Sequence, residues 1–451
     1  MKRVLIVTYY WPPSGGSGVQ RWLKFAKYLP ALGWAPVVVA PAGADYPVVD
    51  ESLLADVAEG TEVLRFPIRE PYAAYRRLTG APAGDVRAAP AGGGGQRPGL
   101  MRRFAGWIRA NFFVPDPRVW WVRPTSRRVI AYLRERPVDA IVTTGPPHSV
   151  HLIGRHVKRA FPTLPWIVDV RDPWSRFDVH LAFGPGRRAR RRNAELERAC
   201  LAECDLVLGT SPSMPTHLEP FDARKYVAIT NGYDAADFPA APTVPRPPVE
   251  TGRFHLYHTG LLGANRNPTA LWAALAALAR EDAGFGESLH VHLIGNVDVA
   301  VVESLAAHLP LAGRWTVTPW LAHDALVARY ADADAFLLCP NRSDNARGQI
   351  NGKLFEYLAA RRPILHVGPF DADNTRLLDE THAGLTVPPG DEDAARQAVE
   401  ALYSGRFSAN PHALPADAAA PYERRATAAR LAAVLDRLPS TPNAKPVPTP
   451  V

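Results

Sequence analysis

Short runs rich in Val, Ile and Leu alternate along this chain with longer stretches of helical pattern, and this alternation constrains the fold more than any other feature. In the first half the runs are RVLIVTYY, APVVVAP, EVLRFPI, DAIVTTG, WIVDVRD, DLVLGTS and VAITNG; in the second half they are FHLYHTG, HVHLIGN, WTVTPW, AFLLCP, PILHVG and GLTVPP. Many are apolar on both faces, as expected of parallel strands covered by helices on each side. The pattern predicts an α/β chain with two doubly wound parallel sheets.

A proline-rich segment, FPAAPTVPRPPVETG, separates the two sets of strands. Its prolines make it unsuited to a helix or a central strand, so we expect a stiff linker there. Residues 80–99 are rich in Gly, Ala and Pro and predict a mobile loop inside the first domain. The expected boundaries are an N-terminal Rossmann-like domain at 1–237, a linker at 238–252, a C-terminal Rossmann-like domain at 253–421, a last helix at 422–438 and a disordered tail at 439–451.

Composition limits the class of protein to which the chain can belong and the kinds of partner that it can bind. The chain has 451 residues, 47% of them hydrophobic and 21% charged, which is typical of a soluble globular protein with more than one core. Its 52 Lys and Arg against 44 Asp and Glu leave a charge of +8, which favours acidic partners such as nucleotides, sugar phosphates, anionic lipid or nucleic acid. Three irregularly spaced cysteines predict neither a disulfide framework nor a zinc site, so we expect a cytoplasmic protein.

A glycine turn follows the first expected strand. Gly15, Gly16 and Gly18 stand between this strand and a helical pattern, where glycine lets backbone N–H groups approach a pyrophosphate at the positive end of the helix. The third glycine of the dinucleotide-binding fingerprint is absent. The turn alone therefore fits either a phosphate site or a simple tight turn.

Two loops in the second half contain a more specific combination. The first ends a strand at Gly260 and contains Arg266, and the second leads into the helical pattern NGKLFEYLAA, which contains Lys353 and Glu356. If these loops are neighbours, Arg266, Lys353 and the helix N-terminus converge on one anion, while Glu356 accepts hydrogen bonds from ribose hydroxyls. The alternative is an exposed ion pair one turn apart, worth only a few tenths of a kcal/mol.

These motifs, taken in order, resemble the retaining GT-B glycosyltransferases of family 4. The resemblance rests on the P-x-G-G turn, TNGYD at 230–234, HTG followed by Arg266, and the K-x-x-E helix; VPDPRVWW, TTGPPHSVHLIG and DVRDPW are similar to a bacterial branch that builds cell-surface polysaccharide. It extends from residue 2 to about 438. The resemblance implies two Rossmann-like domains facing across a cleft, with the C-terminal helix crossing back to the first domain. It also implies sugar transfer, with retention, from a nucleotide-sugar donor to a glycan or lipid-linked acceptor, with a UDP-sugar favoured.

The resemblance also assigns roles in donor binding. Arg266 and Lys353 would neutralise the diphosphate and Glu356 would hold the ribose, while Gly15, Gly16 and Gly260 would allow the backbone to approach the donor. The family usually has a second Glu eight positions before the ribose Glu, and here that position is Gly348. Candidates to replace it at the sugar are Asp344, Asn345 and Gln349, or backbone N–H groups alone.

Two residues of the first half are the catalytic candidates. His148 follows the strand AIVTTG and Asp172 follows WIVDV, and the family places His or Asp on such loops near the anomeric carbon and the acceptor hydroxyl. The alternatives are a helix-capping or exposed role for His148 and a structural turn for Asp172. Retention in this family needs no enzyme nucleophile, so positioning and charge stabilisation would suffice, and no cofactor or metal is expected. Asp332 and Asp334 form a D-x-D pair, which we interpret as solvated turn residues.

Basic and aromatic residues are interleaved in LMRRFAGWIRANFF, residues 100–113, and arginines gather between Arg187 and Arg192. Such a pattern favours peripheral docking on the anionic inner face of the cytoplasmic membrane, although most helices of this kind pack on a sheet. Nucleic-acid binding is disfavoured because no known binding module surrounds these arginines. Two rival functions stay open: a GT-B sugar-nucleotide 2-epimerase, and a catalytically idle nucleotide-sugar-binding protein, which would explain Gly348.

Overall fold

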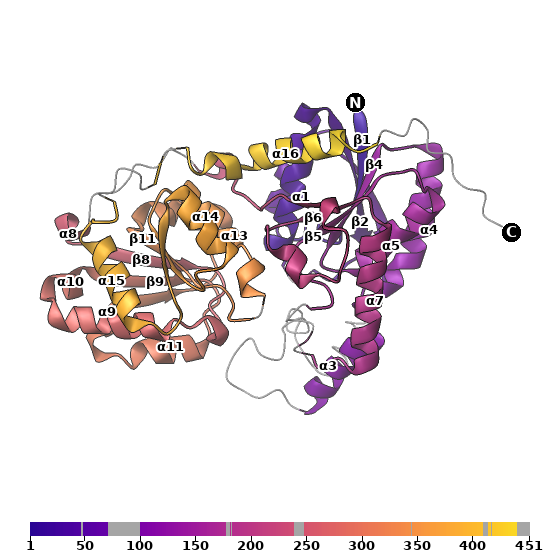
Figure 1. The fold of residues 1–451 in the computed structure, drawn as a ribbon. Coiled ribbons are helices and arrows are strands. Elements are labelled where there is room, and N and C mark those ends of the chain that lie inside the picture. The colour runs from indigo at the N-terminus through magenta and orange to yellow at the C-terminus, as the bar shows by residue number, and fades with distance from the viewer. Residues whose placement is uncertain are drawn as a thin grey trace. The chain divides into compact units, whose positions relative to one another are not determined.

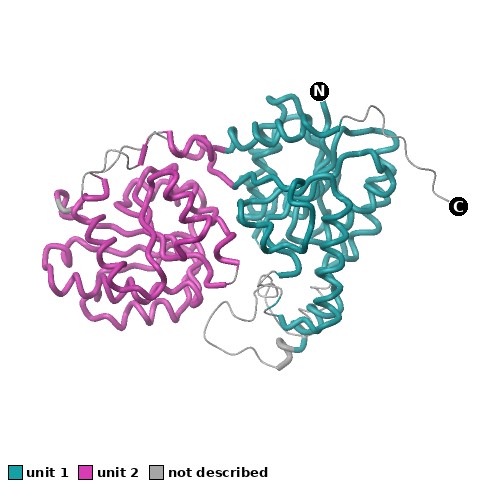
Figure 2. The backbone as a smooth tube through the Cα atoms, viewed as in Figure 1, with its two compact units in different colours: residues 1–91, 97–230, 424–451 teal, residues 92–96, 231–423 magenta. Residues whose placement is uncertain are grey.

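A computed structural model places most of the chain. It describes residues 1–46, 48–70, 100–176, 181, 183–238, 248–343, 345–408, 414–415 and 417–439. The described residues form two compact units: unit 1 contains those up to Thr230 and those from Arg424 onward, and unit 2 contains those between Asn231 and Glu423 (Figure 2). The expected loop at 80–99 and residues 440–451 of the expected tail lie outside the described residues.

Unit 1 is built on a seven-stranded parallel sheet in the order β3-β2-β1-β4-β5-β6-β7 (Figure 1). Its strands are β1 Lys2–Val7, β2 Trp34–Ala42, β3 Glu62–Pro67, β4 Ala140–Gly145, β5 Trp166–Val170, β6 Leu206–Gly209 and β7 Tyr226–Ala228. In the central strand β1, Leu5 and Val7 face one core while Val4 and Ile6 face the other. This alternation of buried residues explains why the run is apolar throughout.

Helices cover both faces of the sheet of unit 1. They are α1 Ser17–Tyr28, α3 Leu100–Phe112, α4 Val119–Glu135, α5 Ser149–Ala160, α7 Arg187–Glu203 and α16 Arg424–Asp436. Figure 1 shows α16 beside α1, and Leu431 and Leu435 of α16 are buried in the same core as Trp22 and Phe25 of α1. The C-terminal helix therefore returns to the first domain, as the resemblance implied.

Unit 2 contains a six-stranded parallel sheet in the order β10-β9-β8-β11-β12-β13. The strands are β8 Phe254–Thr259, β9 Leu289–Ile294, β10 Trp315–Thr318, β11 Ala335–Leu338, β12 Ile364–Val367 and β13 Gly384–Val387. The helices are α8 Pro248–Thr251, α9 Thr269–Glu281, α10 Ala283–Ser288, α11 Val299–Ala306, α12 His323–Arg329, α13 Gly352–Ala359, α14 Asp373–Thr381 and α15 Glu392–Tyr403. One core lies against α9, α11 and α15, and the other against α12, α13 and α14. Both sheets are thus doubly wound and parallel, which confirms the predicted fold class.

One expectation about the linker was wrong. Residues 248–251 form the short helix α8, which ends just before β8. Proline at the first position of a helix loses no hydrogen bond, because the N–H there has no partner within the helix. The Thr251 hydroxyl donates to the Pro248 carbonyl at 3.1 Å and closes this turn.

The strand orders locate the positions where a ligand can bind. In unit 1, β1 lies between β2 and β4, and in unit 2, β8 lies between β9 and β11. At such a switch point the two connections leave on opposite faces of the sheet, which opens a crevice at the carboxyl ends of the two central strands. The loops after β1, β4, β8 and β11 carry most of the residues selected from the sequence.

Candidate functional site

In unit 2, the turn after β8 brings Lys353 to the switch point. Gly260 has φ +104°, a conformation that side-chain-bearing residues rarely adopt, and its N–H donates to the Ile294 carbonyl of β9 at 2.7 Å. A Cβ at this position would lie 3.8 Å from Cε of Lys353. Because Lys353 is in the first turn of α13, which follows β11, the segments that follow β8 and β11 are in contact.

Lys353 and Glu356 are a partly buried pair. Lys353 Nζ lies 3.0 Å from Oε2 of Glu356, and the two side chains are 30% and 20% exposed. The Tyr330 hydroxyl donates to the same oxygen at 2.6 Å. A carboxylate held by a tyrosine is more ordered than one in an exposed ion pair. Among the described residues no group donates to Oε1 of Glu356, which can therefore accept hydrogen bonds from a ligand.

Sequence reasoning missed Tyr330, which holds Glu356, and the role of Tyr357, which ties α13 to the end of β8. Tyr330 and Tyr357 are buried, and Thr259 at the end of β8 bonds the Tyr357 hydroxyl through both its N–H and its Oγ1, each at 3.0 Å. Burial, together with the charge of Glu356, raises the pKa of Tyr330 well above its ordinary value, and burial raises the pKa of Tyr357. Both phenols therefore stay protonated. Tyr357 adjoins Glu356 in the sequence, but no local signal points to Tyr330.

Arg266 and Lys353 both reach the turn after β8, Arg266 at Leu261 and Lys353 at Gly260. Burial lowers the pKa of His258 to about 4, and the charges of Arg266 and Lys353 act in the same direction. Arg266 is anchored by hydrogen bonds from Nε to Asn341 Oδ1 at 2.6 Å and from Nη1 to the Leu261 carbonyl at 3.2 Å. The switch point of unit 2 is thus basic, with Glu356 beside the cations.

The loop before α13 leaves the start of this helix without a side-chain cap. Asn345 is buried and precedes the 3-10 turn Ala346–Gly348, whereas Gln349 is half-buried. Asn351 occupies the N-cap position, but its side chain accepts a hydrogen bond from Asn374 at 2.9 Å instead of capping the helix. The first N–H groups of α13 are therefore available to an anion. Asp344 lies outside the described residues.

His323, which the sequence did not single out, lies at the start of α12. Its Nε2 is 3.3 Å from Oδ2 of Asp237. The hydrogen bond to Asp237 raises the pKa of His323, and the negative charge of Glu356 contributes in the same direction. A titrating imidazole therefore lies within electrostatic reach of the Glu356 carboxylate.

In the turn after β1 of unit 1, Gly15 and Gly16 are glycine for different reasons. A Cβ at Gly15 would lie 2.8 Å from Cγ1 of Val48, and the Gly15 N–H donates to the Val48 carbonyl at 2.8 Å. Gly16 has φ +83°, forms the N-cap of α1 and would meet no described atom within 4 Å of an added Cβ. Gly15 is thus required by packing, while Gly16 leaves open space at a helix N-terminus.

His148 and the loop of Asp172 lie together at the ends of β4 and β5. The His148 ring is buried and stacks on Trp174, with 5.2 Å between centroids and 5° between planes. His148 is the N-cap residue of α5, but its side chain makes no capping hydrogen bond; Asp116, from the VPDP motif, accepts from the Ser149 N–H at 2.8 Å instead. The alternative of an exposed or helix-capping side chain for His148 is therefore not observed. Asp172 is half-buried, two residues before Trp174.

Two other carboxylates have structural roles. Asp169 is fully buried and accepts hydrogen bonds from Trp22 Nε1 at 2.6 Å and from Arg21 Nη2 at 3.1 Å, joining β5 to α1. Asp334 corrects our interpretation of the D-x-D pair: only Asp332 is exposed, whereas Asp334 is 5% exposed and accepts from the His255 N–H at 2.8 Å. A carboxylate just before β11 is buried because it binds a backbone N–H that β8 leaves free.

An aromatic surface lies on α3 and the start of α4. Phe104, Trp107, Phe112 and Trp120 are 58%, 46%, 71% and 55% exposed. The exposed arginines 187, 188 and 190–192 begin α7, and the Gly186 N–H just before them donates to Asn111 Oδ1 of α3 at 2.8 Å. Basic and aromatic groups are thus neighbours in unit 1. Among the helices of the described residues, none is both long and apolar enough to cross a membrane.

The two parallel sheets and the loops at their switch points define the GT-B fold, and comparisons with known proteins agree. Sucrose-phosphate synthase from Thermosynechococcus elongatus superposes with a TM-score of 0.62 at 14% identity, over 97% of this chain and 99% of that one. The Anabaena protein HepE, whose structure was solved in complex with UDP, gives a TM-score of 0.59 at 12% identity, over 97% of this chain and 100% of that one. At these identities the likeness concerns the fold alone.

Sequence comparisons find glycosyltransferases similar to part of this chain. Residues 253–405 match the family described as Glycosyl transferases group 1. A stretch of 160 residues is 36% identical to the UDP-N-acetylglucosamine--N-acetylmuramyl-(pentapeptide) pyrophosphoryl-undecaprenol N-acetylglucosamine transferase of Sorangium cellulosum (strain So ce56). This match covers 34% of this chain and 36% of that enzyme, so the chain spans about a third of the length of its curated relative. The matching family and the relative both consist of glycosyltransferases, so these comparisons do not favour the epimerase alternative.

Proposed function

We propose that the protein is a retaining glycosyltransferase that moves a sugar from a nucleotide-sugar donor to a glycan or lipid-linked acceptor, with a UDP-sugar as the favoured donor. The observation that carries this proposal is that Arg266 and Lys353 both reach the turn after β8, with Glu356 bound to Lys353, at the switch point of unit 2. The match of residues 253–405 to group 1 glycosyl transferases supports it, as does the UDP bound to a protein of the same fold.

In this proposal the cations and the carboxylate bind different parts of the donor. Arg266, Lys353 and the first N–H groups of α13 would neutralise the diphosphate, whose charge grows as the bond to the sugar breaks. Glu356 would accept hydrogen bonds from the ribose through Oε1 while Tyr330 and Lys353 hold Oε2. The leaving phosphate would take the proton of the acceptor hydroxyl on the same face of the sugar. This scheme requires no metal and no enzyme nucleophile.

The sugar itself would be held by neutral hydrogen-bonding groups instead of a second carboxylate. Gly348 occupies the position where the family has Glu, so Asn345, Gln349 and backbone N–H groups are the proposed partners of the sugar hydroxyls. Gly260 and, in unit 1, Gly16 would permit close approach of the backbone to the donor, while Gly15, packed against Val48, would shape the turn.

His148 and Asp172 are the proposed residues for acceptor alignment. Both follow strands next to the switch point of unit 1, and the stacking of His148 on Trp174 ties the two loops together. Asp172 would orient the acceptor hydroxyl, and His148 would contact the sugar near its anomeric carbon.

We also propose that the protein works in the cytoplasm, bound peripherally to the inner face of the membrane. The exposed aromatic residues of α3 and the arginines at the start of α7 support this proposal, since aromatic rings insert at the headgroup level while arginines attract anionic lipid. Such a location would suit a lipid-linked acceptor. We propose no nucleic-acid partner.

A thermal-shift panel of UDP-, GDP-, ADP- and CMP-sugars tests the donor. A ligand at 100 times its dissociation constant adds about 2.7 kcal/mol to the free energy of unfolding, so one base should stand out, and we expect UDP. Nucleotide release is then measured with and without candidate acceptors. Release that depends on acceptor supports a transferase. Conversion of the sugar without acceptor would establish the epimerase, and binding without any turnover would establish the idle binding protein.

A further inference from the structure

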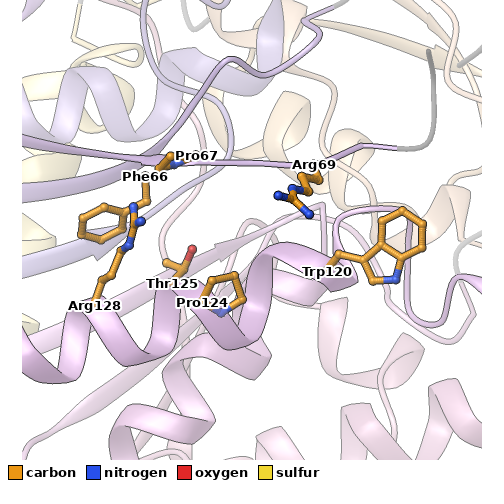
Figure 3. A pocket seen from close by; sticks show the side chains of 7 residues that line it. All are labelled: Phe66, Pro67, Arg69, Trp120, Pro124, Thr125 and Arg128. Carbon is orange, nitrogen blue, oxygen red and sulfur yellow. The ribbon is translucent and has the colours of Figure 1, made fainter. Parts of the chain in front are cut away.

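A cavity of about 600 Å³ opens in unit 1, away from the loops described above. Phe66, Pro67 and Arg69 line it from the end of the edge strand β3, and Trp120, Pro124, Thr125 and Arg128 line it from α4 (Figure 3). β2 separates β3 from β1, so this cavity does not belong to the switch point of unit 1. Nothing in the proposed function accounts for it.

The cavity contains a buried hydroxyl that lacks a hydrogen bond. Thr125 is 1% exposed, and its Oγ1 has no hydrogen-bond partner among the described residues. Hydroxyls in helices commonly donate to the carbonyl four residues earlier, and the adjacent Ser126 does so with Val122 at 2.7 Å. Figure 3 shows the Thr125 hydroxyl pointing into the space between β3 and α4. A ligand oxygen would satisfy this group.

Two arginines give the cavity a positive charge. Arg69 and Arg128 are exposed at its two walls, and within the described part of the chain neither forms an ion pair. Arg128 is oriented by the Phe66 ring, whose centroid is 5.4 Å from the guanidinium carbon. The neighbouring carboxylate, Glu70, is already engaged by Arg118 at 3.1 Å and by the Tyr9 hydroxyl at 2.9 Å. Two cations without a carboxylate favour a dianionic ligand.

The remaining wall is apolar and continues outward. Trp120 lies at one end of the cavity, is 55% exposed, and packs edge-on against Phe113 with 5.1 Å between centroids. Phe113 adjoins Phe112, which is 71% exposed and belongs to the aromatic surface of α3. An apolar chain attached to the anion could therefore lie along Trp120 and Phe113.

We infer that the cavity binds the phosphomonoester of a lipid. Its phosphate, which carries a charge of about −1.5 to −2 at neutral pH, would lie between Arg69 and Arg128 and accept a hydrogen bond from Thr125, while its chain would lie along Trp120. A phosphodiester, as in membrane phospholipids, carries only one negative charge and matches two arginines less well. The inference goes beyond the proposed function: because the cavity lies away from the switch point of unit 1, the lipid phosphate is a separate ligand and not the acceptor of the sugar.

Calorimetry on the full chain, with ligands kept below their micelle concentrations, tests this inference. The probes are farnesyl phosphate, farnesol, inorganic phosphate and dihexanoyl-phosphatidylglycerol. We expect farnesyl phosphate to bind at least about tenfold more tightly than each of the others, because only it combines a dianion with an apolar chain. Equal binding of phosphatidylglycerol would assign the cavity to membrane headgroups. Equal binding of inorganic phosphate would show that the apolar chain is not recognised, and equal binding of farnesol would show that the phosphate is not recognised. Each of these results overturns the inference, and so does the absence of binding.

Substitutions in the cavity test whether farnesyl phosphate binds there. Arg69→Ala and Arg128→Ala should each lower the affinity for farnesyl phosphate about tenfold or more. Thr125→Val, which keeps the shape of the side chain, should lower this affinity severalfold. The matched control is Arg127→Ala, which removes an exposed arginine of the same helix that does not line the cavity. Unchanged affinity in the three cavity variants, with melting temperatures like that of the wild type, would place the lipid elsewhere. UDP affinity of the wild type is measured separately, so a failure of the proposed donor site is distinguished from a failure of this one.

Discussion

Replacing Glu356 and Lys353 separately gives the sharpest test of the donor site. If the pair were only a surface ion pair, either alanine variant would cost well under 1 kcal/mol of stability and leave donor affinity unchanged. In the structure, however, Glu356 Oε2 is already bound by Lys353 at 3.0 Å and by Tyr330 at 2.6 Å, which leaves Oε1 for the ribose. Each loss of a charge-assisted hydrogen bond then costs roughly 1.5 to 3 kcal/mol, or about 10- to 150-fold in donor affinity.

The two variants should also differ in their ligand preference. Glu356→Ala should weaken both UMP and the UDP-sugar, because the ribose is present in both. Lys353→Ala should penalise ligands with a diphosphate most, because its ammonium group lies by the Gly260 turn at the proposed phosphate position. Calorimetric titration of wild type and variants with UMP, UDP and the UDP-sugar measures both effects.

An exposed pair in the same unit gives a matched control. Glu281 binds Arg396 at 2.6 Å, and the side chains are 52% and 35% exposed. Glu281→Ala should leave both affinity and stability close to the wild-type values. Donor affinity like that of the wild type in both Glu356→Ala and Lys353→Ala would refute the nucleotide site on α13.

Three further predictions concern other parts of the chain. Asp172→Asn should lower turnover at least about tenfold while donor affinity persists, and unchanged turnover would make Asp172 a structural turn residue. Residues 100–113, with the arginines 187–192, should bind anionic liposomes in a salt-sensitive way; equal partitioning onto neutral vesicles in a sedimentation assay would contradict this. The pKa of His323, followed by NMR, should lie above its ordinary value of 6.5 and should fall in Asp237→Asn, since the hydrogen bond to Asp237 is the largest cause of the shift. Because the folded-state pKa is raised, this contact contributes stability below about pH 6.5 and loses it as pH rises through the folded-state value.

The sequence determined the two sheets and the positions of their strands. Each of the apolar runs quoted above overlaps a strand of the observed sheets, since the pattern of a buried parallel strand is local and survives any arrangement of its neighbours. The glycines at 15, 16 and 260 and the helix of Lys353 were also visible, because backbone conformation and helical spacing are properties of short segments.

Other features were decided by the tertiary structure alone. Tyr330 reaches Glu356 only where the segments before and after β11 pack together. Lys353 reaches the Gly260 turn only because β8 and β11 are neighbours in the sheet, although their sequences are far apart. Asp334 appeared to be a solvated turn residue, yet it is buried because a backbone N–H of β8 needs an acceptor there. Likewise, Thr125 is an ordinary helical residue in the sequence, and its unpartnered hydroxyl exists only where α4 faces the end of β3. Periodicity encodes which residues are buried, but which buried groups meet depends on strand order, and strand order is set by the packing of the whole domain.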